Sequence, residues 1–412
     1  MSKRNIIIII LALIIAGVSA YSYFFVQKNQ ESNSANQADG GFFSNLFPSS
    51  GENTISSNKD DSSNGTDTIK DSITDEDNED YGEILEPPKQ LTMDPISGYG
   101  VVSTSSARYI ESATGHIYEV DFKGENYSRL SNTTLLKTEE SFWSPKADKV
   151  LVRYLNGISG SMTIKNYSAV LPKSASSTEL TGAFLTDFRG IAVSPYEEAL
   201  TILEKNANKY DLILTNFENG KRKLLASFPI GQFNLSWSGK NTVTLLTKPA
   251  KGIPGFLYGV DIKTGAIKKI AGGESGFTAS LSPLNNFAFY SKTDDGGSVK
   301  GYFYDVKKNL ELSFNTDTLA DKCAWSNKTE GVIYCAVPKS YPAGVYPDDW
   351  YKGAKSTEDR LWLIDALTGE VGVLSEDMGG SIDTVDIKLT SDENYLLYKN
   401  KKDDTLWVMR IR

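Results

Sequence analysis

Short segments of alternating apolar and polar residues, separated by turns, fill the chain from about residue 89 to its end. Side chains alternate with a period of two along a strand, whereas a helix repeats every 3.6 residues or so. β-Branched and aromatic residues, which favour strands, dominate segments such as Leu200–Leu203 (LTIL) and Phe287–Tyr290 (FAFY). The pattern therefore predicts an all-β domain over residues 89–412.

A recurring serine divides this domain into similar units. The serine ends one short strand and begins a turn, and a β-rich second strand follows it. The serines are Ser144, Ser194, Ser238, Ser282, Ser326 and Ser391. A third strand then ends in Asp or Asn, with Gly or Asn three or four residues later, as at Asp261 and Gly265, which is hairpin chemistry. Seven such four-stranded units of about 45 residues predict a seven-bladed β-propeller.

The last unit lacks its fourth strand, because the chain ends at Arg412 after only three strands. The segment Lys89–Thr92, which directly follows two prolines, resembles the outermost strand of a unit. We expect it to complete the seventh unit and close the ring. Closure removes the free sheet edges that would otherwise promote aggregation.

Several of these motifs resemble the TolB-type, WD-like family of propeller repeats. The motifs are Trp143-Ser144-Pro145-Lys146, Ser194-Pro195, Ser282-Pro283 and the segment from Leu361 to Gly369. They look like the Ser-Pro-Asp-Gly and Asp-x-x-x-Gly signatures of that family, although the Asp-Gly after Ser-Pro is degenerate in every unit. The whole layout is similar to membrane-anchored propellers of small-genome bacterial lineages. The resemblance covers residues 89–412 and implies fold and location, but no activity.

An uncharged run of 21 residues, from Ile6 to Val26, precedes the β domain. Its length matches the roughly 20 residues that cross a bilayer as a helix. Lys3 and Arg4 lie before it, so the positive-inside rule places the N-terminus in the cytoplasm and the β domain outside. We expect a signal-anchor helix over residues 1–27. A signal peptide cleaved after Ala20 is the alternative, and it also exports the domain.

The segment between the anchor and the β domain, residues 28–88, is rich in Ser, Asn, Asp and Glu. It cannot bury enough apolar surface to offset its chain entropy, so we expect a disordered acidic linker. Residues 27–88 hold 14 acidic and three basic side chains, whereas residues 89–412 hold 38 of each. Neither part offers the concentrated positive charge that nucleic acids require, so nucleic acid is not an expected partner.

The strong signatures of catalytic and cofactor sites are missing from the sequence. There is no Gly-x-Ser-x-Gly, no His-Glu-x-x-His, no phosphate-binding loop and no Cys-x-x-Cys pair. His116, the single histidine, lies beside a turn glycine, and no room for a hydrolase domain follows the repeats. These observations predict a protein that is not an enzyme and that needs no metal or other cofactor.

Cys323 and Cys335 are the two cysteines of the chain, and Thr329 lies midway between them. In a symmetric hairpin they would face each other, within the distance that a disulfide bridges. Export from the cytoplasm would allow oxidation. We therefore expect a disulfide, with two buried thiols as the alternative.

The same unit is longer than the others, and the excess lies between Ala336 and Arg360. This insertion joins the second and third strands of its unit, so we expect it on the face where propellers commonly bind ligands. Its candidate ligand-binding residues are Tyr341, Tyr346, Asp348, Asp349, Trp350, Tyr351 and Lys352. Aromatic rings among charged groups suit stacking on a sugar or clamping of a peptide. Alternatively, these rings fold back and cap the propeller.

The function expected from the sequence is recognition of a protein, peptide or glycan at the cell envelope by a membrane-tethered propeller. One alternative is an envelope hydrolase with an acidic site in the central funnel, for which Asp383, Asp386 and Lys388 on the last inner strand are candidates. A structural subunit of an envelope or secretion assembly is the other alternative.

Overall fold

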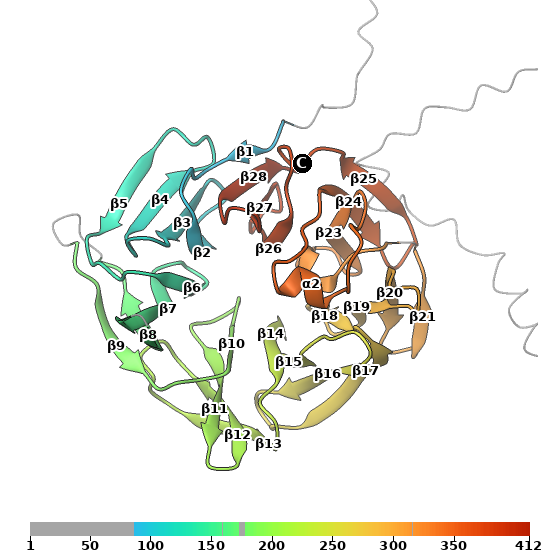
Figure 1. Cartoon of the computed structure of the whole chain (residues 1–412), viewed down its shortest axis with the longest axis horizontal. Coiled ribbons are helices and arrows are strands. Elements are labelled where there is room, and N and C mark those ends of the chain that lie inside the picture. The colour runs from blue at the N-terminus through green and yellow to red at the C-terminus, as the bar shows by residue number, and fades with distance from the viewer. Residues whose placement is uncertain (1–85, 159, 173–177, 315) are drawn as a thin grey trace, which may run out of the picture. The chain divides into compact units, whose positions relative to one another are not determined.

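The computed structural model describes residues 86–158, 160–172, 178–314 and 316–412. In this part of the chain, seven four-stranded antiparallel sheets, the blades, are arranged in a ring (Figure 1). This confirms the predicted all-β, seven-bladed propeller. The predicted anchor and nearly all of the predicted linker lie outside the described residues. Among the residues described, no helix is long and apolar enough to cross a membrane.

Within each blade the strands follow one another outward from the ring centre, except in blade 7, whose outermost strand is β1. Blade 1 comprises β2 (Ile96–Val101), β3 (Ser106–Glu111), β4 (Ile117–Asp121) and β5 (Tyr127–Ser131). Blade 2 comprises β6 (Thr138–Trp143), β7 (Lys149–Ile158), β8 (Ser161–Val170) and β9 (Thr181–Leu185). Blade 3 comprises β10 (Gly190–Val193), β11 (Leu200–Asn206), β12 (Lys209–Thr215) and β13 (Lys223–Phe228).

Blades 4 and 5 comprise β14 (Phe233–Gly239), β15 (Thr242–Thr247), β16 (Pro254–Asp261) and β17 (Ile267–Ser275); and β18 (Thr278–Leu281), β19 (Phe287–Thr293), β20 (Val299–Asp305) and β21 (Leu310–Leu312). Blades 6 and 7 comprise β22 (Cys323–Trp325), β23 (Val332–Pro338), β24 (Asp359–Asp365) and β25 (Val371–Ser375); and β26 (Thr384–Leu389), β27 (Tyr395–Asn400), β28 (Leu406–Arg410) and β1 (Lys89–Gln90). A 3₁₀ turn, η3 (Ala320–Lys322), precedes β22, and the short helix α2 (Asp348–Tyr351) lies in the insertion between β23 and β24.

The recurring serine closes the turn between the first and second strands of a blade. At Ser144 the backbone N–H donates to the Lys149 carbonyl (2.9 Å), and the Ser144 hydroxyl accepts from the Lys149 N–H (3.0 Å). In blade 7 the same bonds involve Thr390, whose hydroxyl accepts from the Tyr395 N–H (3.1 Å). The sequence analysis placed this role on Ser391, one residue too far. A threonine hydroxyl closes this turn as well as a serine hydroxyl does, so a pattern of serines alone does not mark Thr390.

Aspartates cap the turn between the third and fourth strands. The Asp261 carboxylate accepts hydrogen bonds from the backbone N–H groups of Lys263 (3.0 Å) and Thr264 (2.7 Å). Gly265 follows with a φ of +75°, a conformation that glycine adopts without a steric cost. The predicted pairing of Asp261 with Gly265 is thereby confirmed as a turn motif.

The N-terminal strand β1 closes the ring by pairing with β28, as the sequence predicted. Lys89 lies opposite Val408 and Gln90 opposite Trp407. The next residue, Leu91, donates its N–H to the Leu406 carbonyl (2.7 Å), and its side chain is fully buried in the core between blades 7 and 1. The first and last parts of the described chain are therefore held together by both hydrogen bonds and apolar packing.

Cys323 and Cys335 lie directly opposite each other on β22 and β23, with their Cα atoms 4.1 Å apart. They form a disulfide, so the predicted bridge is confirmed. β22 is the innermost strand of blade 6. The disulfide therefore ties the inner wall of this blade to the strand that leads into the insertion.

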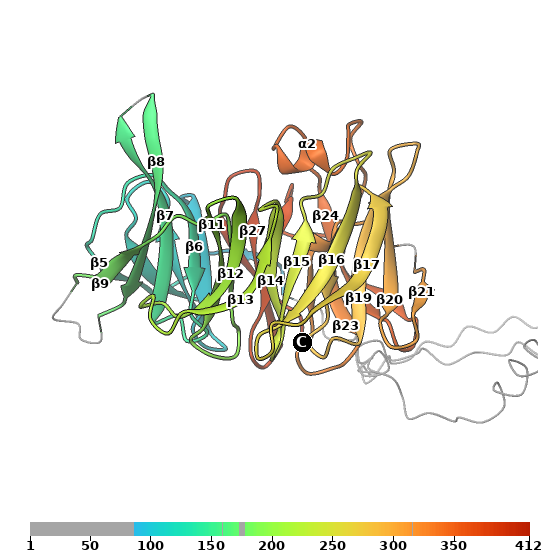
Figure 2. The same ribbon diagram turned by 90° about the horizontal axis from the view of Figure 1, so that it is seen from below.

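The insertion rises from one face of the ring. Figure 2 shows α2 on the same side as the long β7–β8 hairpin, whereas the C-terminus lies on the opposite side. We call the side that carries α2 the insertion face. The serine turns join first and second strands, so antiparallel pairing places them on the opposite face.

Candidate functional site

A fully buried ion cluster lies beneath the insertion. The Lys322 ammonium lies 2.6 Å from the Asp359 carboxylate and 2.5 Å from the Asp383 carboxylate, and none of the three side chains is exposed. The Thr357 hydroxyl and backbone N–H also bond to Asp383 (3.1 Å each). Burial acts to raise the pKa of Asp383, but Lys322 and the hydrogen bonds outweigh it, so this pKa is lower than that of an ordinary aspartate.

Two of the predicted ligand-binding aromatic residues are part of this buried region. The Trp350 indole N–H donates to both carboxylate oxygens of Asp383 (3.0 and 3.1 Å), and its side chain is only 3% exposed. Tyr346 is 2% exposed, donates its hydroxyl to the Pro342 carbonyl (2.9 Å), and packs edge-on against the ring of Tyr341. The insertion is thus fixed to the propeller by its own aromatic side chains.

The other candidates of the insertion lie nearer to solvent. Tyr351 is 36% exposed, and Lys352 is exposed at the end of α2. Asp348 and Asp349 are half-buried and accept backbone N–H bonds from Lys251 and Val345, respectively (2.8 Å each). The structure therefore gathers all seven candidates in one loop, with Tyr351 and Lys352 at its surface. Their binding of a ligand stays a prediction.

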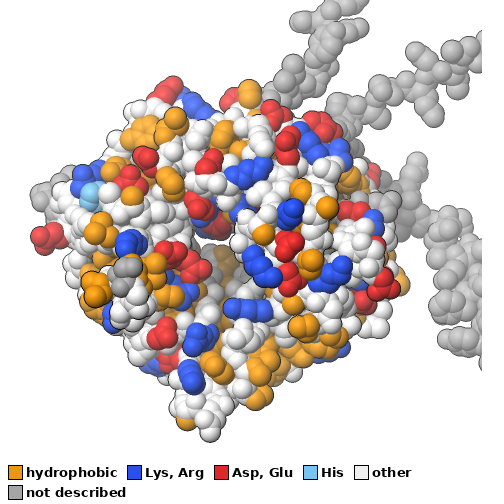
Figure 3. Space-filling model, in the orientation of Figure 1, with side chains coloured by type: hydrophobic (Ala, Val, Ile, Leu, Met, Phe, Trp, Pro, Cys, Tyr) orange, Lys and Arg blue, Asp and Glu red, His pale blue; other side chains and the backbone are white. Residues whose placement is uncertain are grey.

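A cavity of about 690 Å³ occupies the centre of the ring, and the innermost strands of all seven blades line it. Figure 3 shows the insertion face hollowed at this point, with charged side chains of both signs around the opening. Seven serines lie in the wall. Ser141, Ser236, Ser238 and Ser280 are at least partly exposed, whereas Ser97, Ser144 and Ser194 are buried. The charged residues among those that line the cavity are Glu140, Asp386 and Lys388.

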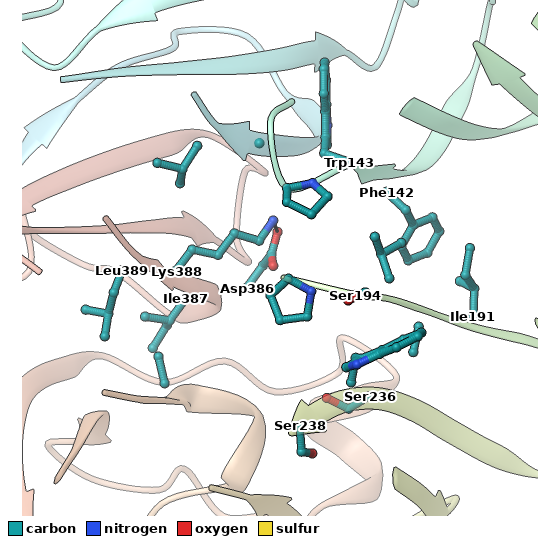
Figure 4. Close-up of a pocket in the computed structure, with 18 of the residues that line it drawn as sticks. Phe142, Trp143, Ile191, Ser194, Ser236, Ser238, Asp386, Ile387, Lys388 and Leu389 are labelled. Atoms are coloured by element: carbon teal, nitrogen blue, oxygen red, sulfur yellow. Dashed lines mark hydrogen bonds and ion pairs between the residues drawn. The ribbon is translucent and has the colours of Figure 1, made fainter. Parts of the chain in front are cut away.

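Asp386 and Lys388 both come from β26, the inner strand of blade 7, and their side chains extend toward the middle of the cavity (Figure 4). The Lys388 ammonium lies 3.3 Å from the Asp386 carboxylate. The strand is bulged here, because Val385 pairs with Lys399 and Lys388 with Leu397, so Asp386 and Ile387 together oppose one residue. Asp386 has a φ of +51°, a strained conformation for a residue other than glycine. Bulges and strained residues concentrate at functional sites.

Tyr99, on β2 of blade 1, contacts both members of this pair. Its hydroxyl bonds to the backbone carbonyls of Asp386 and Leu397, the latter at 2.9 Å. Its own carbonyl accepts a hydrogen bond from the Lys388 ammonium (2.7 Å), which lies 4.1 Å from the centre of the Tyr99 ring. Burial and the nearby Asp386 carboxylate raise the pKa of Tyr99 well above its usual value, so this hydroxyl is a hydrogen-bond donor at any physiological pH.

The remaining acidic group of the cavity, Glu140, comes from β6 of blade 2 and is held by the Arg153 guanidinium at 2.6 Å. His116 is not among the cavity residues. It lies beside Arg129 (3.1 Å between side-chain nitrogens), and partial burial together with that charge lowers the pKa of His116. Among the described residues, no group of three His, Cys, Asp or Glu side chains is placed to hold a metal ion.

The sequence analysis identified two of the three charged cavity residues through its hydrolase alternative. Asp386 and Lys388 face the cavity, whereas Asp383, the third candidate on that strand, is buried in the ion cluster. Glu140 and Tyr99 were missed. A signal for Glu140 exists, since residues shortly before each serine turn belong to an inner strand. No local signal marks Tyr99, because its partners lie almost 300 residues away.

No family model matches the sequence, and no curated protein matches it. Solved structures do match the fold. An oligogalacturonate lyase in complex with manganese aligns over 80% of this chain and 98% of its own length, with 10% identity and a TM-score of 0.51. An oligogalacturonate lyase from Vibrio parahaemolyticus aligns over 80% of this chain and 96% of its own length, with 9% identity and a TM-score of 0.52. At these identities the likeness establishes the propeller fold alone.

These matches contradict the reasoning behind one prediction. The absence of a hydrolase domain and of the familiar motifs led us to expect a protein that is not an enzyme. The two lyases are enzymes, and this propeller covers 96% or more of each. A propeller of this size therefore needs no added domain in order to be an enzyme. The prediction that the protein is not an enzyme was therefore wrong, because it rested on the missing hydrolase domain.

Proposed function

We propose that this protein is an enzyme of the cell envelope that cleaves a carbohydrate chain in the central cavity of its propeller. The observation that carries the proposal is the Asp386–Lys388 pair, which a strained bulge presents to an open cavity with many hydroxyl groups. Strained backbone in a packed fold is a cost to stability, and it commonly persists where a side chain must be aimed at a substrate.

The pair suits hydrolysis of a glycosidic bond. The Asp386 carboxylate acts as the general base and takes a proton from water as the water oxygen attacks the anomeric carbon. The Lys388 ammonium, 3.3 Å from the base, orients the Asp386 carboxylate, and a water molecule protonates the departing glycosidic oxygen on the other side of the sugar. The bond between the anomeric carbon and that oxygen breaks, and one water molecule is consumed. Glu140 contributes a second carboxylate to the same cavity, and the exposed serine hydroxyls bind the hydroxyl groups of the sugar.

Elimination is a second candidate reaction, and the likeness to oligogalacturonate lyases favours it. In this reaction Asp386 would remove the proton from C5, the carbon that bears the uronate carboxylate. A C4–C5 double bond forms as the bond between C4 and the glycosidic oxygen breaks, and that oxygen leaves with a proton from water. Lys388 would stabilise the negative charge that develops on that carboxylate. Manganese is named with one of those lyases. The described residues of this chain do not fit a metal site, so neither reaction is routed through a metal ion.

We place the enzyme outside the cytoplasmic membrane because Lys3 and Arg4 precede the uncharged run from Ile6 to Val26. Residues 27–88 would then act as a spacer between the membrane and the ring. The Ser-Pro and Asp-x-x-x-Gly motifs support a relationship to TolB-type propellers. Protease added to intact spheroplasts should release the propeller by cutting in residues 27–88. Complete protection of the chain would contradict this orientation.

We also propose that Tyr351 and Lys352, which do not line the cavity, contact the part of the carbohydrate chain that extends past it on the insertion face. Both side chains reach the surface of the insertion, and the buried neighbours Tyr346 and Trp350 hold that surface in place. A rigid aromatic surface binds a sugar ring with little ordering cost.

The test is a cleavage assay of the purified full-length protein with a panel of neutral and uronate-containing oligosaccharides. Hydrolysis is measured as new reducing ends without ultraviolet absorbance, whereas elimination adds the absorbance of an unsaturated sugar. Asp386→Asn should lower kcat by roughly 10²- to 10⁴-fold, the usual contribution of a general acid or base. Lys388→Met should also lower kcat, because it removes the cation that orients this carboxylate.

The matched controls are Asp317→Asn and Lys300→Met. These residues form an ion pair of similar exposure (2.6 Å) that does not line the cavity, and their loss should leave kcat unchanged. Failure of the wild-type protein to cleave any glycan of the panel would contradict the proposed function. Full activity of Asp386→Asn would contradict the role of the pair.

A further inference from the structure

We propose that Tyr99 is the positioning residue for this site, holding Asp386 and Lys388 in place from the neighbouring blade. This inference rests on the proposed function for its catalytic consequence. Tyr99 lies on β2 of blade 1, while Asp386 and Lys388 lie on β26 of blade 7. The site is therefore assembled across the junction between the first and last blades of the ring.

The Tyr99 hydroxyl acts on the bulge. Its bond to the Asp386 carbonyl and its 2.9 Å bond to the Leu397 carbonyl join the bulged strand β26 to its neighbour β27. One hydroxyl proton is shared between these two acceptors. Leu397 pairs with Lys388, directly after the bulge. The hydroxyl thus holds both strands where the register shifts, and we infer that it stabilises the positive φ of Asp386.

The rest of Tyr99 acts on the ammonium group. The Tyr99 carbonyl accepts the Lys388 hydrogen bond at 2.7 Å, and the ring lies beneath the same nitrogen at 4.1 Å. A cation is attracted to the face of an aromatic ring. Tyr99 therefore holds Asp386 through its hydroxyl, and it holds the Lys388 ammonium through its backbone carbonyl and its ring. Tyr99 itself does not carry the reaction, so its role is positioning.

The closing strand β1 supports Tyr99 in turn. Leu91, which follows β1, belongs to the same buried apolar cluster as Tyr99 and Leu397. This cluster fills the junction between blades 1 and 7. When β1 pairs with β28, Leu91 fills the outer side of this cluster, where Tyr127 of β5 donates its hydroxyl to the Leu91 carbonyl (3.0 Å), while Tyr99 lies on the innermost strand. We infer that ring closure supports the charged pair through this shared cluster.

The test is Tyr99→Phe, which removes the hydroxyl but keeps the ring and the backbone carbonyl. The matched control is Tyr398→Phe. Tyr398 is also fully buried, and its hydroxyl donates to one backbone carbonyl, that of Met378, at 2.6 Å. It is the residue that opposes the bulge. Each variant loses one buried tyrosine hydroxyl, at the junction of blades 1 and 7 for Tyr99 and within blade 7 for Tyr398. The free energy of unfolding should therefore fall by a similar amount in both.

Two measurements separate positioning from stability. The first is the rate at which an amine-acylating reagent modifies Lys388 in the full-length protein, followed by mass spectrometry, which requires no substrate. Tyr99→Phe should accelerate it several-fold, because the relaxed bulge loosens the Lys388 contact with the Tyr99 carbonyl. The second is glycan cleavage, where kcat should fall by about ten- to a hundredfold with little change in KM. Tyr398→Phe should change neither.

Equal labelling and equal kcat in the two variants would overturn the proposal. Faster labelling in Tyr99→Phe, together with a wild-type protein that cleaves no glycan, would support the positioning role and contradict the proposed function.

A second pair of variants tests the contribution of closure and covers the case in which Tyr99→Phe does not fold. Leu91→Ala keeps Tyr99 intact but leaves a void in the apolar cluster that contains both residues, and it should also accelerate Lys388 labelling. Met93→Ala, two residues further at an 85% exposed position, should not. A lower Tm for Leu91→Ala with unchanged labelling would overturn the link between ring closure and the site.

Discussion

Lys322 and Asp383 form an ion pair with 2.5 Å between Nζ and Oδ1 and with no solvent exposure on either side chain. The pair joins η3, before the inner strand of blade 6, to the residue that precedes the inner strand of blade 7. Trp350 and Thr357 of the insertion bond to the same carboxylate. The insertion is thus attached to the wall of the central cavity through buried charges.

Removal of the cation from this cluster should strongly destabilise the domain. Lys322→Met leaves the Asp359 and Asp383 carboxylates buried without their counter-ion, and breaking a buried pair typically costs about 3–5 kcal/mol. Lys300→Met removes the ion pair between the Lys300 ammonium and the Asp317 carboxylate (2.6 Å), in which both side chains are substantially exposed. Its loss should cost less than about 1 kcal/mol of the free energy of unfolding. Urea unfolding of both variants measures the difference. Similar losses would show that burial of the Lys322 cluster contributes no special stability.

The cluster should also make the insertion sensitive to acid. The pKa of folded Asp383 lies below its unfolded value of about 3.9, so the unfolded state binds more protons between these two values. The stability contributed by the Asp383 carboxylate is therefore present above about pH 4 and is lost as the pH falls through the folded pKa. Unfolding free energies of wild type and Asp383→Asn, measured from pH 6 downward, should converge in acid. A constant difference at all pH values would contradict this linkage.

The disulfide should stabilise the propeller through its effect on the unfolded chain. Cys323 and Cys335 are separated by 12 positions, and the chain-entropy estimate for a loop of this length is about 3 kcal/mol. Thermal unfolding of the full-length protein with and without a reducing agent measures this contribution. The double variant Cys323→Ser/Cys335→Ser is the control, because a reducing agent should not change its Tm. An equal drop in Tm for both proteins would mean that the reductant acts elsewhere.

Deletion of the closing strand should expose a sheet edge. Removal of residues 89–92 takes away the partner of β28 and the buried Leu91 side chain, so we expect a lower Tm and aggregation. Deletion of residues 28–80 should leave the Tm unchanged, because ring closure uses none of them. Equal behaviour of the two deletions would contradict the closing role of β1.

Trp350 and Tyr351 should respond to substitution in different ways. Trp350→Ala removes a 3% exposed indole that donates to Asp383, and the loss of a buried tryptophan costs about 3–5 kcal/mol. Tyr351→Ala removes a 36% exposed ring whose hydroxyl donates to Asp321 (2.7 Å), so it should lower the Tm less than Trp350→Ala does and raise KM for the glycan. Differential scanning fluorimetry and steady-state kinetics separate the effects. An unchanged KM for Tyr351→Ala would remove Tyr351 from the proposed binding surface.

Most of the fold could be predicted from sequence because its turns rely on short-range chemistry. The hydroxyl of Ser144 and the carboxylate of Asp261 bond to backbone N–H groups only a few residues away, so each turn leaves a local pattern. The Cys323–Cys335 bridge follows the same logic, since a symmetric hairpin sets the register of its two strands. The closing strand could be predicted because a ring built from repeats leaves one strand unaccounted for at its ends.

The site could be predicted only in part, because it depends on contacts between distant segments. Asp386 and Lys388 could be placed on an inner strand, but the bulge that aims them arises from pairing with β27. Tyr99 comes from the other end of the domain and carries no motif. The sequence also left open whether Trp350 faces solvent or the interior. Trp350 faces the interior, because the buried Asp383 carboxylate accepts a hydrogen bond from its indole N–H and the Lys322 ammonium lies over its ring.

The closing strand also determines how the domain would respond to mechanical load. β1 is only two residues long, and Glu86, three residues before it, lies beside Arg410. A pull on the N-terminal segment would reach the ring first at the clasp formed by β1 and β28. Only two residues of this clasp are paired, so it should open at a lower force than the longer strand pairs of the blades. Because Leu91 and Tyr99 belong to the same buried apolar cluster, opening of this clasp would disturb the junction from which Tyr99 contacts Asp386 and Lys388.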